Sequence, residues 1–497
     1  MKYSFISAEE AAASIHNGNT IGIGGFSSVG TPKAVPAALA VYAEKLHSEG
    51  KEFKVGLITG GATGSQVDSA LAQAHAVAFR TPFQSNKEMR NAINAGEVQY
   101  YDVHLSQIGQ DVRYGFLGDI DVAIVEASDI TEEGDIVLST SVGISPTLIQ
   151  VAHKVIIELN EAHASKLTGM HDIYIPDAPP YRREIPIYRV NDRAGSISVR
   201  VNPEKVVGVV RTNERDRIAA FTPLNDTTSR IGQNVADFLL GEYQRGAIPR
   251  EFLPLQSGVG NIANAVLGAL GADKKLPAFS MYTEVIQNSV IDLMMQERIR
   301  FVAGSSLTLS DDRLDMLYDN IDVMKERVLL RPQEITNHPE MIRRLGIIAV
   351  NTALEADIFG NVNSTHVLGS KMMNGIGGSA DFARNAYLSI FTTPSTAKDG
   401  LISSIVPHVS HVDSTEHDVR ILVTEQGVAD WRGKSPSQRA RCIIENCAHP
   451  DYKELLWDYL KLSEGKGCHT PMSLRNALKM HIAFAETGDM RNTKFEM

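Results

Sequence analysis

Three glutamates stand at the ends of short apolar runs, and each could do chemistry. They are Glu126 in "VAIVEAS", Glu284 in "SMYTEVIQ" and Glu425 in "ILVTEQG". A carboxylate in such a place can act as a base or a nucleophile, but it can also cap the next helix or pair with a buried arginine. For any one of them the structural role is the more common one. Three at equivalent places favour at least one functional carboxylate.

Glu284 has a further feature in its local sequence. An amphipathic run starts at the next residue, and we expect a helix there whose N-terminal dipole stabilises an anion beside it. A glutamate in that position is ionised near pH 7. The sequence therefore favours Glu284 as a base or a nucleophile.

Glycine-rich turns are the second chemical feature. "QSGVGNIANAV" contains Gly258 and Gly260, and "MNGIGGSADFARNAYLSIF" contains Gly375, Gly377 and Gly378 ahead of a predicted helix. Backbone N–H groups at such turns can bind an oxyanion or a phosphate. The alternative for any single turn is tight packing.

The second glycine turn also matches a dinucleotide fingerprint if it is read literally, from Gly375 through Gly377 to Ala380, with Asp399 downstream. That fingerprint needs an apolar strand directly before it, and "NSTHVLGSKMMN" is a poor strand. We therefore favour the oxyanion or phosphate role for this turn.

The histidines of "PHVSHVDSTEHD" are His408, His411 and His417. Their spacings fit no compact ligand set on one face, so we expect a polar connection between strands and no metal site. No GxSxG, HExxH or P-loop pattern occurs either.

Composition limits the class of partner. The net charge of −11 argues against a nucleic-acid binder and against adhesion to anionic membranes, although a local basic cluster can still hold phosphates. The three cysteines form no CxxC pair, which is typical of a reducing compartment. No signal-peptide core or stretch of about 18 apolar residues appears, so we expect a cytoplasmic location.

Short apolar runs alternate with amphipathic runs of helical length, which predicts an α/β fold with mostly parallel sheets. Expected strands in the first part are 19–25, 53–60, 98–105, 121–128, 135–143, 154–160, 196–201 and 205–210, with a helix at 33–50. After a Pro-rich break the expected order is helix 228–246, strand 252–258, helix 261–271, strand 279–284, helix 285–299, strand 300–305 and strand 420–427. We predict two domains, 1–222 and 223–497, with the active site in a cleft between them, beyond the carboxyl ends of the strands.

Several long segments resemble one family. "GFSSVGTPKAVPAAL", "LPLQSGVGNIANAV", "MYTEVIQNSVIDL", "VNSTHVLGSKMMNGIGGSADFARNAYLSIF" and "VTEQGVADWRGKSPSQRA" look like the acetyl-CoA hydrolase/transferase family, and within it like the bacterial succinate, acetate and propionate CoA-transferases. The resemblance covers nearly the whole chain. Ala380 stands where that family usually has a glycine.

The resemblance implies two domains of the NagB/RpiA/CoA-transferase type, a homodimer and a ping-pong reaction. A catalytic glutamate, by motif position Glu284, forms an acyl-glutamyl anhydride and then a glutamyl-CoA thioester. Acyl-CoA and short-chain carboxylates (acetate, propionate, butyrate, succinate) are the implied substrates, without a prosthetic group. Hydrolysis of acetyl-CoA at the same glutamate is the alternative activity.

Further site residues carry over by motif position. Val259 and Gly378 match backbone oxyanion donors, and Asn337 matches an active-site asparagine. The positions that match contacts to CoA are Gly258, Val259, Gly260, Asn261, Ile262, Asn374, Gly378, Lys398 and Glu425. Arg217 matches an arginine that holds the substrate carboxylate, and Thr81 an acyl-site residue, while Glu126 has no implied role.

Two further hypotheses come from other functional classes. A nicotinamide-dependent oxidoreductase would use the Gly375 turn and would change NADH absorbance. A CoA-binding sensor without catalysis would have no turnover for a substitution at Glu284 to abolish.

Overall fold

The computed structural model describes residues 2–218, 223–464 and 468–496. The chain divides into two compact units, each built from separate stretches of sequence. Unit 1 consists of Met1–Ala220, Ser280–Leu345 and Asn374–Asp381, and unit 2 of Phe221–Phe279, Gly346–Met373 and Phe382–Met497. The domain boundary that we predicted after residue 222 falls next to residues 219–222, which lie outside the described residues, and it stays a prediction.

The first sheet of unit 1 is parallel apart from one strand. Its order is β4-β3-β2-β1-β5-β7-β8, with β6 antiparallel to β5. The strands are β1 (Thr20–Ile23), β2 (Val55–Thr59), β3 (Val77–Thr81), β4 (Gln99–Tyr100), β5 (Val122–Ile130), β6 (Ile136–Leu138), β7 (Lys154–Asn160) and β8 (Val206–Thr212). The central strands are near-continuous apolar runs because helices cover a parallel sheet.

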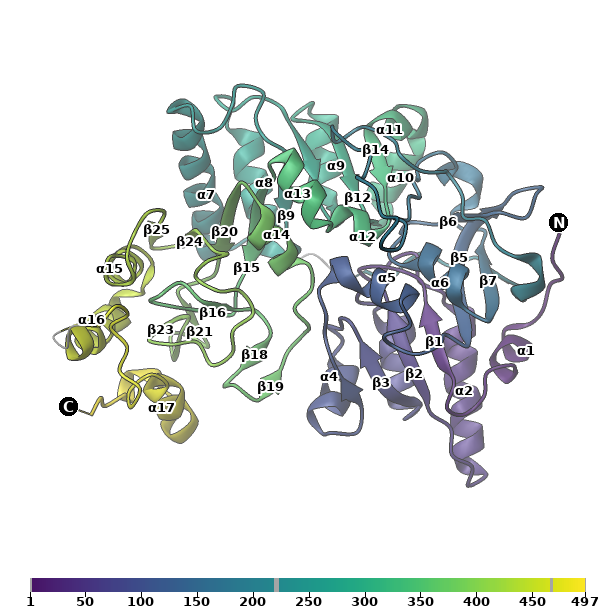
Figure 1. The fold of residues 1–497 in the computed structure, drawn as a ribbon, viewed down its shortest axis with the longest axis horizontal. Coiled ribbons are helices and arrows are strands. Elements are labelled where there is room, and N and C mark those ends of the chain that lie inside the picture. Colours follow the sequence, from purple (N-terminus) through teal and green to yellow (C-terminus); the bar gives the residue numbers. More distant parts are fainter. Residues whose placement is uncertain (1, 219–222, 465–467, 497) are drawn as a thin grey trace. The chain divides into compact units, whose positions relative to one another are not determined.

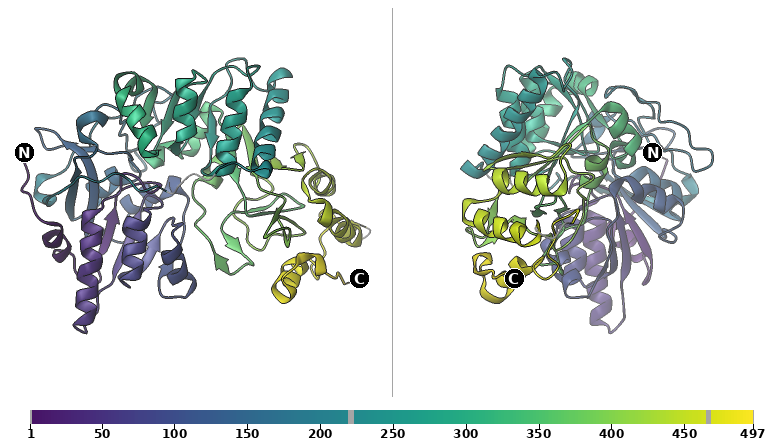
Figure 2. Two further views of the ribbon diagram at one scale, coloured as in Figure 1. Left: turned by 180° about the vertical axis from the view of Figure 1, so that it is seen from behind. Right: turned by 60° about the vertical axis from the view of Figure 1, so that its left-hand side comes forward.

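Helices surround this sheet. They are α1 (Ala8–Ala13), α2 (Ala34–Ser48), α3 (Ala70–Gln73), α4 (Lys87–Asn94), α5 (Leu105–Arg113) and α6 (Ser145–Val151). Figures 1 and 2 show α1 beside α2, and both contribute to a buried core with Ile21, Leu57 and Ile124.

Two strand predictions in this region are wrong. The expected strand 98–105 is only two residues long, and Leu105, Ile108 and Val112 instead form the buried face of α5, with the spacing of a helix. Residues 196–201 make only isolated bridges, at Ser196 and Val199, and no strand. Both segments have a short alternating pattern, but most of their residues have no neighbouring strand with which to pair.

Unit 1 also contains three strands in the order β14-β12-β10 and a separate two-stranded ribbon, β11 with β13. These strands are β10 (Phe279–Tyr282), β11 (Val285–Gln287), β12 (Ile299–Gly304), β13 (Ser306–Thr308) and β14 (Val328–Leu330). The helices here are α9 (Asn288–Met295), α10 (Asp311–Asp319), α11 (Ile321–Arg327), α12 (Gln333–Thr336) and α13 (Pro339–Leu345).

The helix that we expected from residue 285 starts only at Asn288. Val285 and Ile286 pair in parallel with Ser306 and Leu307 before the helix begins. Both residues are β-branched and buried, so pairing in a ribbon outweighs the helical pattern of the longer segment.

Unit 2 is built on the strands β9-β15-β20-β24-β25, of which only β25 is antiparallel to its neighbour. These strands are β9 (Leu255–Ser257), β15 (Ile348–Thr352), β20 (Leu388–Thr392), β24 (Ile421–Thr424) and β25 (Gly427–Asp430). Short ribbons are formed by β16 (Glu355–Asp357), β17 (Val362–Asn363), β18 (His366–Val367), β19 (Lys371–Met372), β21 (Thr396–Ala397), β22 (Ile402–Ser403) and β23 (Ile405–Val406).

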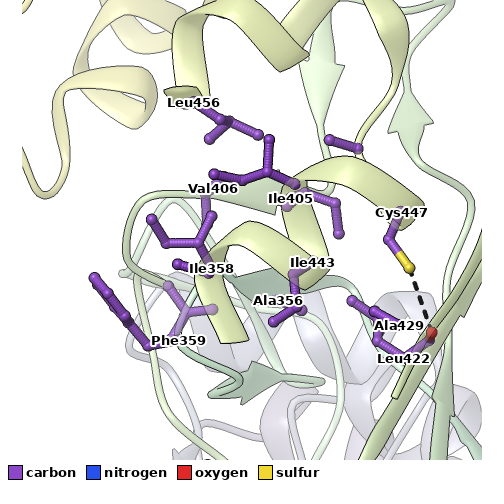
Figure 3. Packing of buried hydrophobic residues seen from close by; sticks show 14 of the residues in the cluster. Ala356, Ile358, Phe359, Ile405, Val406, Leu422, Ala429, Ile443, Cys447 and Leu456 are labelled. Carbon is purple, nitrogen blue, oxygen red and sulfur yellow. Dashed lines mark hydrogen bonds between the residues drawn. The ribbon is translucent and has the colours of Figure 1, made fainter. Parts of the chain in front are cut away.

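The helices of unit 2 pack closely. They are α7 (Asp226–Gln244), α8 (Asn261–Ala272), α15 (Pro436–Cys447), α16 (Pro450–Glu464) and α17 (Lys479–Thr487), while α14 (Ser379–Asn385) begins in unit 1. Figure 2 shows α7 beside α8, where a Cβ at Gly232 would lie 2.6 Å from the backbone of Ala265. Figure 3 shows Ile358, Ile405, Ile443 and Leu456 in the second core.

No described helix is long and apolar enough to cross a membrane. The expected α/β class with mostly parallel sheets is confirmed.

Candidate active site

Glu284 lies in the turn between β10 and β11. Asn337, the residue that ends α12, donates a hydrogen bond from Nδ2 to Glu284 Oε1 at 2.6 Å. Thr336 Oγ1 donates to Asn337 Oδ1 at 2.9 Å. The Asn337 amide is therefore held with its nitrogen toward the carboxylate, because the opposite orientation would face oxygen with oxygen.

The glycine turn before α14 presses against this carboxylate. A Cβ at position 378 would lie 2.0 Å from Glu284 Oε1 and 2.2 Å from Asn337 Nδ2. The turn is anchored by Ile376, whose N–H donates to Asp102 Oδ2 at 2.7 Å, and Gly377 has φ +63°. Position 378 thus needs a glycine so that the backbone can approach Glu284. The turn follows Asn374, whose Nδ2 donates to the carbonyl of Gly375 at 2.9 Å.

The dinucleotide interpretation of this turn does not fit the structure. The strand before it, β19, has two residues and pairs antiparallel with β18 in a small ribbon. The fingerprint requires a strand of a parallel sheet that leads directly into the helix.

Burial raises the pKa of Glu284 to about 7, the Asn337 hydrogen bond opposes this rise, and the nearby Asp381 carboxylate adds to it. Our expectation of an anion stabilised by the following helix is therefore wrong. The three residues of β11 separate Glu284 from the first turn of α9, and a helix dipole acts only over its first turn. The carboxylate is desolvated instead, which makes it more basic.

Asp381 is a second acid at the site, and sequence reasoning missed it; it is buried, whereas Glu284 is partly exposed. Ser106 donates to it twice, from Oγ to Oδ1 at 2.6 Å and from the backbone N–H to Oδ2 at 3.0 Å. Burial raises the pKa of Asp381 to about 7, and the hydrogen bonds from Ser106 and Asn337 oppose this rise. In the sequence Asp381 looks like an ordinary acid in the first turn of a helix, and no local signal links it to Ser106.

An apolar cluster lies directly beside Glu284 in the chain. Val285 packs with Phe26 and Leu105, and Phe83 is partly buried against them. Thr81 is fully buried at the end of β3, and its hydroxyl has no hydrogen-bond partner among the described residues. Arg217 is exposed and pairs with Glu214 at 3.2 Å.

The other predicted residues belong to unit 2. In the turn between β9 and α8, Gly260 has φ +102° and Val259 is exposed, with Gly258, Asn261 and Ile262 on either side of them. Lys398 lies in the turn between β21 and β22, with its ammonium 5.1 Å from the ring of Phe484. Glu425 follows β24 directly and accepts hydrogen bonds from Ser395 and Gln426. These bonds keep the pKa of Glu425 below its ordinary value, although burial opposes them.

Family models match both halves of this sequence. The acetyl-CoA hydrolase/transferase N-terminal domain matches residues 2–211, and the C-terminal domain of the same family matches residues 314–460. The chain belongs to the acetyl-CoA hydrolase/transferase family.

Curated members of the acetyl-CoA hydrolase/transferase family match almost the full length. A succinyl-CoA:acetate CoA-transferase of Clostridium kluyveri is 48% identical over 98% of this chain and 90% of its own. A propanoyl-CoA:succinate CoA transferase of Escherichia coli is 47% identical over 98% of this chain and 99% of its own. An acetyl-CoA hydrolase of Saccharomyces cerevisiae is 44% identical over 98% of this chain and 95% of its own.

Solved structures share the fold at lower identity. RipA from Yersinia pestis has a TM-score of 0.71 and 23% identity over 92% of this chain and 97% of its own. A 4-hydroxybutyrate CoA-transferase from Porphyromonas gingivalis has a TM-score of 0.64 and 22% identity over 92% of this chain and 97% of its own.

Glu126 does not belong to the site around Glu284. It lies inside β5, which continues to Ile130, so our assignment of Glu126 to a strand end is wrong. Lys33 forms ion pairs with Glu126 and with Asp216, the latter at 3.0 Å, and His163 Nε2 lies 3.8 Å from an oxygen of each acid. Glu126, His163 and Asp216 have a spacing that a metal could use, but the Lys33 ammonium already bonds both carboxylates.

The three histidines that we considered in the sequence have separate partners. His408 Nδ1 is 2.9 Å from the carbonyl oxygen of Val409, His411 Nε2 is 3.4 Å from Asp413, and the exposed His417 is 3.7 Å from Glu416. Their side chains do not converge on one point.

Proposed function

We propose that this protein is a CoA-transferase that moves CoA between short-chain carboxylic acids, with Glu284 as the nucleophile. The observation that carries the proposal is the contact of the Glu284 carboxylate with the glycine backbone at Gly378, while Asn337 holds one of its oxygens at 2.6 Å. The curated relatives named as CoA-transferases, at 47–48% identity, support the same activity.

The proposed reaction is an exchange of acyl and thiolate groups on Glu284. A carboxylate oxygen of Glu284 attacks the thioester carbonyl. The C–S bond then breaks, CoA leaves as a thiolate, and the acyl-glutamyl anhydride remains on the enzyme. The thiolate then attacks the glutamyl carbonyl, releasing the first carboxylate and leaving a glutamyl-CoA thioester. The acceptor carboxylate reverses these two steps, so no proton or electron is gained or lost overall.

Each step passes through a tetrahedral oxyanion, which backbone N–H groups at a glycine turn can stabilise. We propose that Gly378 supplies such a group in unit 1. For unit 2 we propose that Val259 does the same, and that Gly258, Gly260, Asn261, Ile262, Lys398 and Glu425 bind CoA, with Asn374 of unit 1. Binding the distal part of CoA can supply energy for the reaction at the thioester.

The apolar cluster next to Glu284 fits a short acyl chain. Phe26, Leu105, Val285 and Phe83 supply apolar surface, and Thr81 offers a buried hydroxyl with no partner among the described residues. We propose that this cluster contacts the acyl group of acetate, propionate, butyrate or succinate. Arg217 stays a candidate for a distal carboxylate. Because a methylene contributes only ~1–3 kcal/mol to selectivity, a substrate panel must decide among these acids.

Hydrolysis of acetyl-CoA is the second candidate. Yeast relatives at 41–46% identity are named acetyl-CoA hydrolases, and water could release the acyl or CoA group from the same glutamate. The rate of acyl-CoA loss with and without acetate or succinate separates the two. A rate that ignores the acceptor would favour hydrolysis.

Trapping tests the nucleophile directly. Acyl-CoA is added, the protein is treated with borohydride or hydroxylamine, and the peptide that contains Glu284 is examined by mass spectrometry. We expect modification at Glu284 alone and none in Glu284→Gln. Full turnover with an unmodified Glu284 would contradict the proposal.

The homodimer and the cytoplasmic location stay predictions. Light scattering on the purified protein and fractionation of cells test them independently of the activity.

A further inference from the structure

Gln333 is a fully buried amide at the start of α12, and the proposed reaction does not use it. Its Nε2 donates two hydrogen bonds, to the carbonyl oxygen of Gly60 at 2.8 Å and to that of Leu105 at 3.2 Å. The nitrogen must face both carbonyls, because the opposite orientation would place oxygen against oxygen. Each hydrogen of this amide thus reaches a different element of unit 1, the end of β2 and the start of α5.

The backbone of Gln333 makes the other half of this junction. Its carbonyl accepts a hydrogen bond from the N–H of Asn337 at 2.9 Å, and its own N–H donates to the carbonyl of Gly143 at 3.1 Å. Asn337 in turn donates from its side chain to Glu284 Oε1 at 2.6 Å. Gln333 therefore links the residue that holds the Glu284 carboxylate to three backbone carbonyls elsewhere in unit 1.

The loop that contains Gly143 reaches Glu284 by a second route. The N–H of Gly143 donates to Ser305 Oγ at 3.2 Å, and the N–H of Val142 donates to the Ser305 carbonyl at 2.9 Å. The N–H of Ser305 donates to the backbone carbonyl of Glu284 at 2.7 Å. The backbone of Glu284 and the amide of Asn337 are therefore both tied to one loop. A shift of α12 against this loop would change the distance between them.

Two of the carbonyls that Gln333 holds adjoin the apolar cluster of Phe26, Leu105, Val285 and Phe83. Leu105 is itself a member of that cluster. Gly60 precedes Gly61, where a Cβ would lie 3.1 Å from the ring of Phe26. The same side chain therefore fixes the helix that bonds the proposed nucleophile and the backbone that supports the proposed acyl site.

The space around the Gln333 amide is narrow. A Cβ at Gly60 would lie 2.5 Å from Gln333 Oε1. At Gly143, where φ is +52°, a Cβ would lie 2.8 Å from the carbonyl oxygen of Gly25. Glycines thus let these turns approach the amide and one another closely. The amide has little room to shift without displacing them.

We propose that Gln333 is a positioning residue that holds Asn337 and Glu284 in register with the acyl group of the thioester. This inference rests on the proposed function, in which Glu284 is the nucleophile and the apolar cluster contacts the acyl chain. Attack requires the carboxylate oxygen and the thioester carbon to be aligned at about 3–3.5 Å, and a displacement of about 1 Å can lower the rate by about 100-fold. Gln333 sets this alignment because one side chain joins the two sides.

The first test is Gln333→Met, which is nearly isosteric and removes both donor bonds. We expect kcat to fall by about 10- to 100-fold, with KM for acyl-CoA within about twofold because other residues make the proposed contacts to CoA. The deciding measurement is the ratio of kcat/KM for the most and the least favoured acyl-CoA of the substrate panel. A misaligned acyl site discriminates less, so this ratio should move toward one by about threefold or more. The ratio does not depend on the fraction of folded protein.

Gly60→Ala perturbs the same contact from the other side, and it is the second variant if Gln333→Met does not fold. Its Cβ would displace the end of the Gln333 side chain, so the ratio should move in the same direction. Asn476→Leu in unit 2 is the matched control. Asn476 is also a buried amide with two donor bonds, to Ser473 Oγ at 3.0 Å and to the carbonyl of Glu496 at 2.9 Å. The control should lower the thermal midpoint and leave the ratio unchanged.

The outcomes separate this inference from the proposed function. If the unmodified protein gives the trapped adduct at Glu284 and the ratio stays constant in both variants, the role of Gln333 is wrong and the nucleophile stands. A lower rate at a constant ratio would mean that Gln333 only supports the fold. An equal change of the ratio in Asn476→Leu would likewise refute a specific role. An unmodified protein without the adduct would instead refute the nucleophilic role of Glu284.

Discussion

The backbone of Gly378 lies so close to Glu284 that a Cβ at position 378 would be 2.0 Å from the carboxylate oxygen Oε1. A side chain at this position would have to displace Glu284, Asn337 or the turn itself. The contact thus places a glycine backbone against the proposed nucleophile.

Gly378→Ala should therefore lower kcat by about 100-fold or more, because a displacement of about 1 Å at a reacting group has that effect. Steady-state kinetics and the yield of the trapped Glu284 adduct measure it. Gly241→Ala in α7 is the matched control, since a Cβ there meets nothing within 4 Å. The control should retain full activity, and equal losses in both variants would contradict the steric explanation.

Asn337→Ala removes the hydrogen bond to Glu284. A hydrogen bond to a charged group contributes about 1.5–3 kcal/mol, so we expect the rate to fall by about 10- to 100-fold. Because this bond lowers the pKa of Glu284, its loss should move the acid limb of kcat/KM to higher pH. A limb that moves to lower pH would show that the amide does not stabilise the carboxylate.

Glu284→Gln should stabilise the protein at high pH. Burial raises the pKa of Glu284 from 4.5 to about 7, so the folded state binds this proton more tightly than the unfolded state. The resulting stabilisation is complete below pH 4.5 and is lost as pH rises to about 7. The variant should therefore exceed the unmodified protein by about 1–2 kcal/mol at pH 8, allowing for partial solvent access, with little difference at pH 4.5.

Thermal midpoints at the two pH values, measured at one scan rate, test this expectation. The same substitution at the exposed Glu132 is the control. A constant difference between pH 4.5 and 8 would contradict the proposed cost of the buried charge.

Lys33→Met should destabilise unit 1. The ammonium is the cation that bonds Glu126 and Asp216, and all three side chains are almost fully buried. Removing one partner of a buried ion pair costs about 3–5 kcal/mol. Adding Glu126→Gln should recover part of the loss, because one uncompensated acid is then removed.

Chemical denaturation measures the change in the free energy of unfolding, and a separate hydrogen-exchange experiment on the amides of β5 locates the effect. Lys51→Met is the control, because Lys51 forms an exposed pair with Glu49 and such pairs contribute about 0–1 kcal/mol. If Lys33→Met were no more harmful than Lys51→Met, the buried cluster would not depend on its cation.

The local sequence predicted much of the fold. The apolar runs around Ile21, Leu57 and Ile124 form parallel strands as expected, because a strand covered on both faces must be apolar throughout. The pattern failed at residues 285–287, where the choice between helix and strand depended on a distant partner strand, β13.

The sequence by itself determined which residue types were available to the site: a carboxylate at 284, an amide at 337 and a glycine at 378. Only the tertiary structure decided their environment. Asp381 and Ser106 are 275 residues apart in the chain, and no local pattern predicts that they meet. The raised pKa of Glu284 comes from burial and from Asp381, because the free energy of a charge depends on the solvent and charges around it in space rather than on its neighbours in sequence.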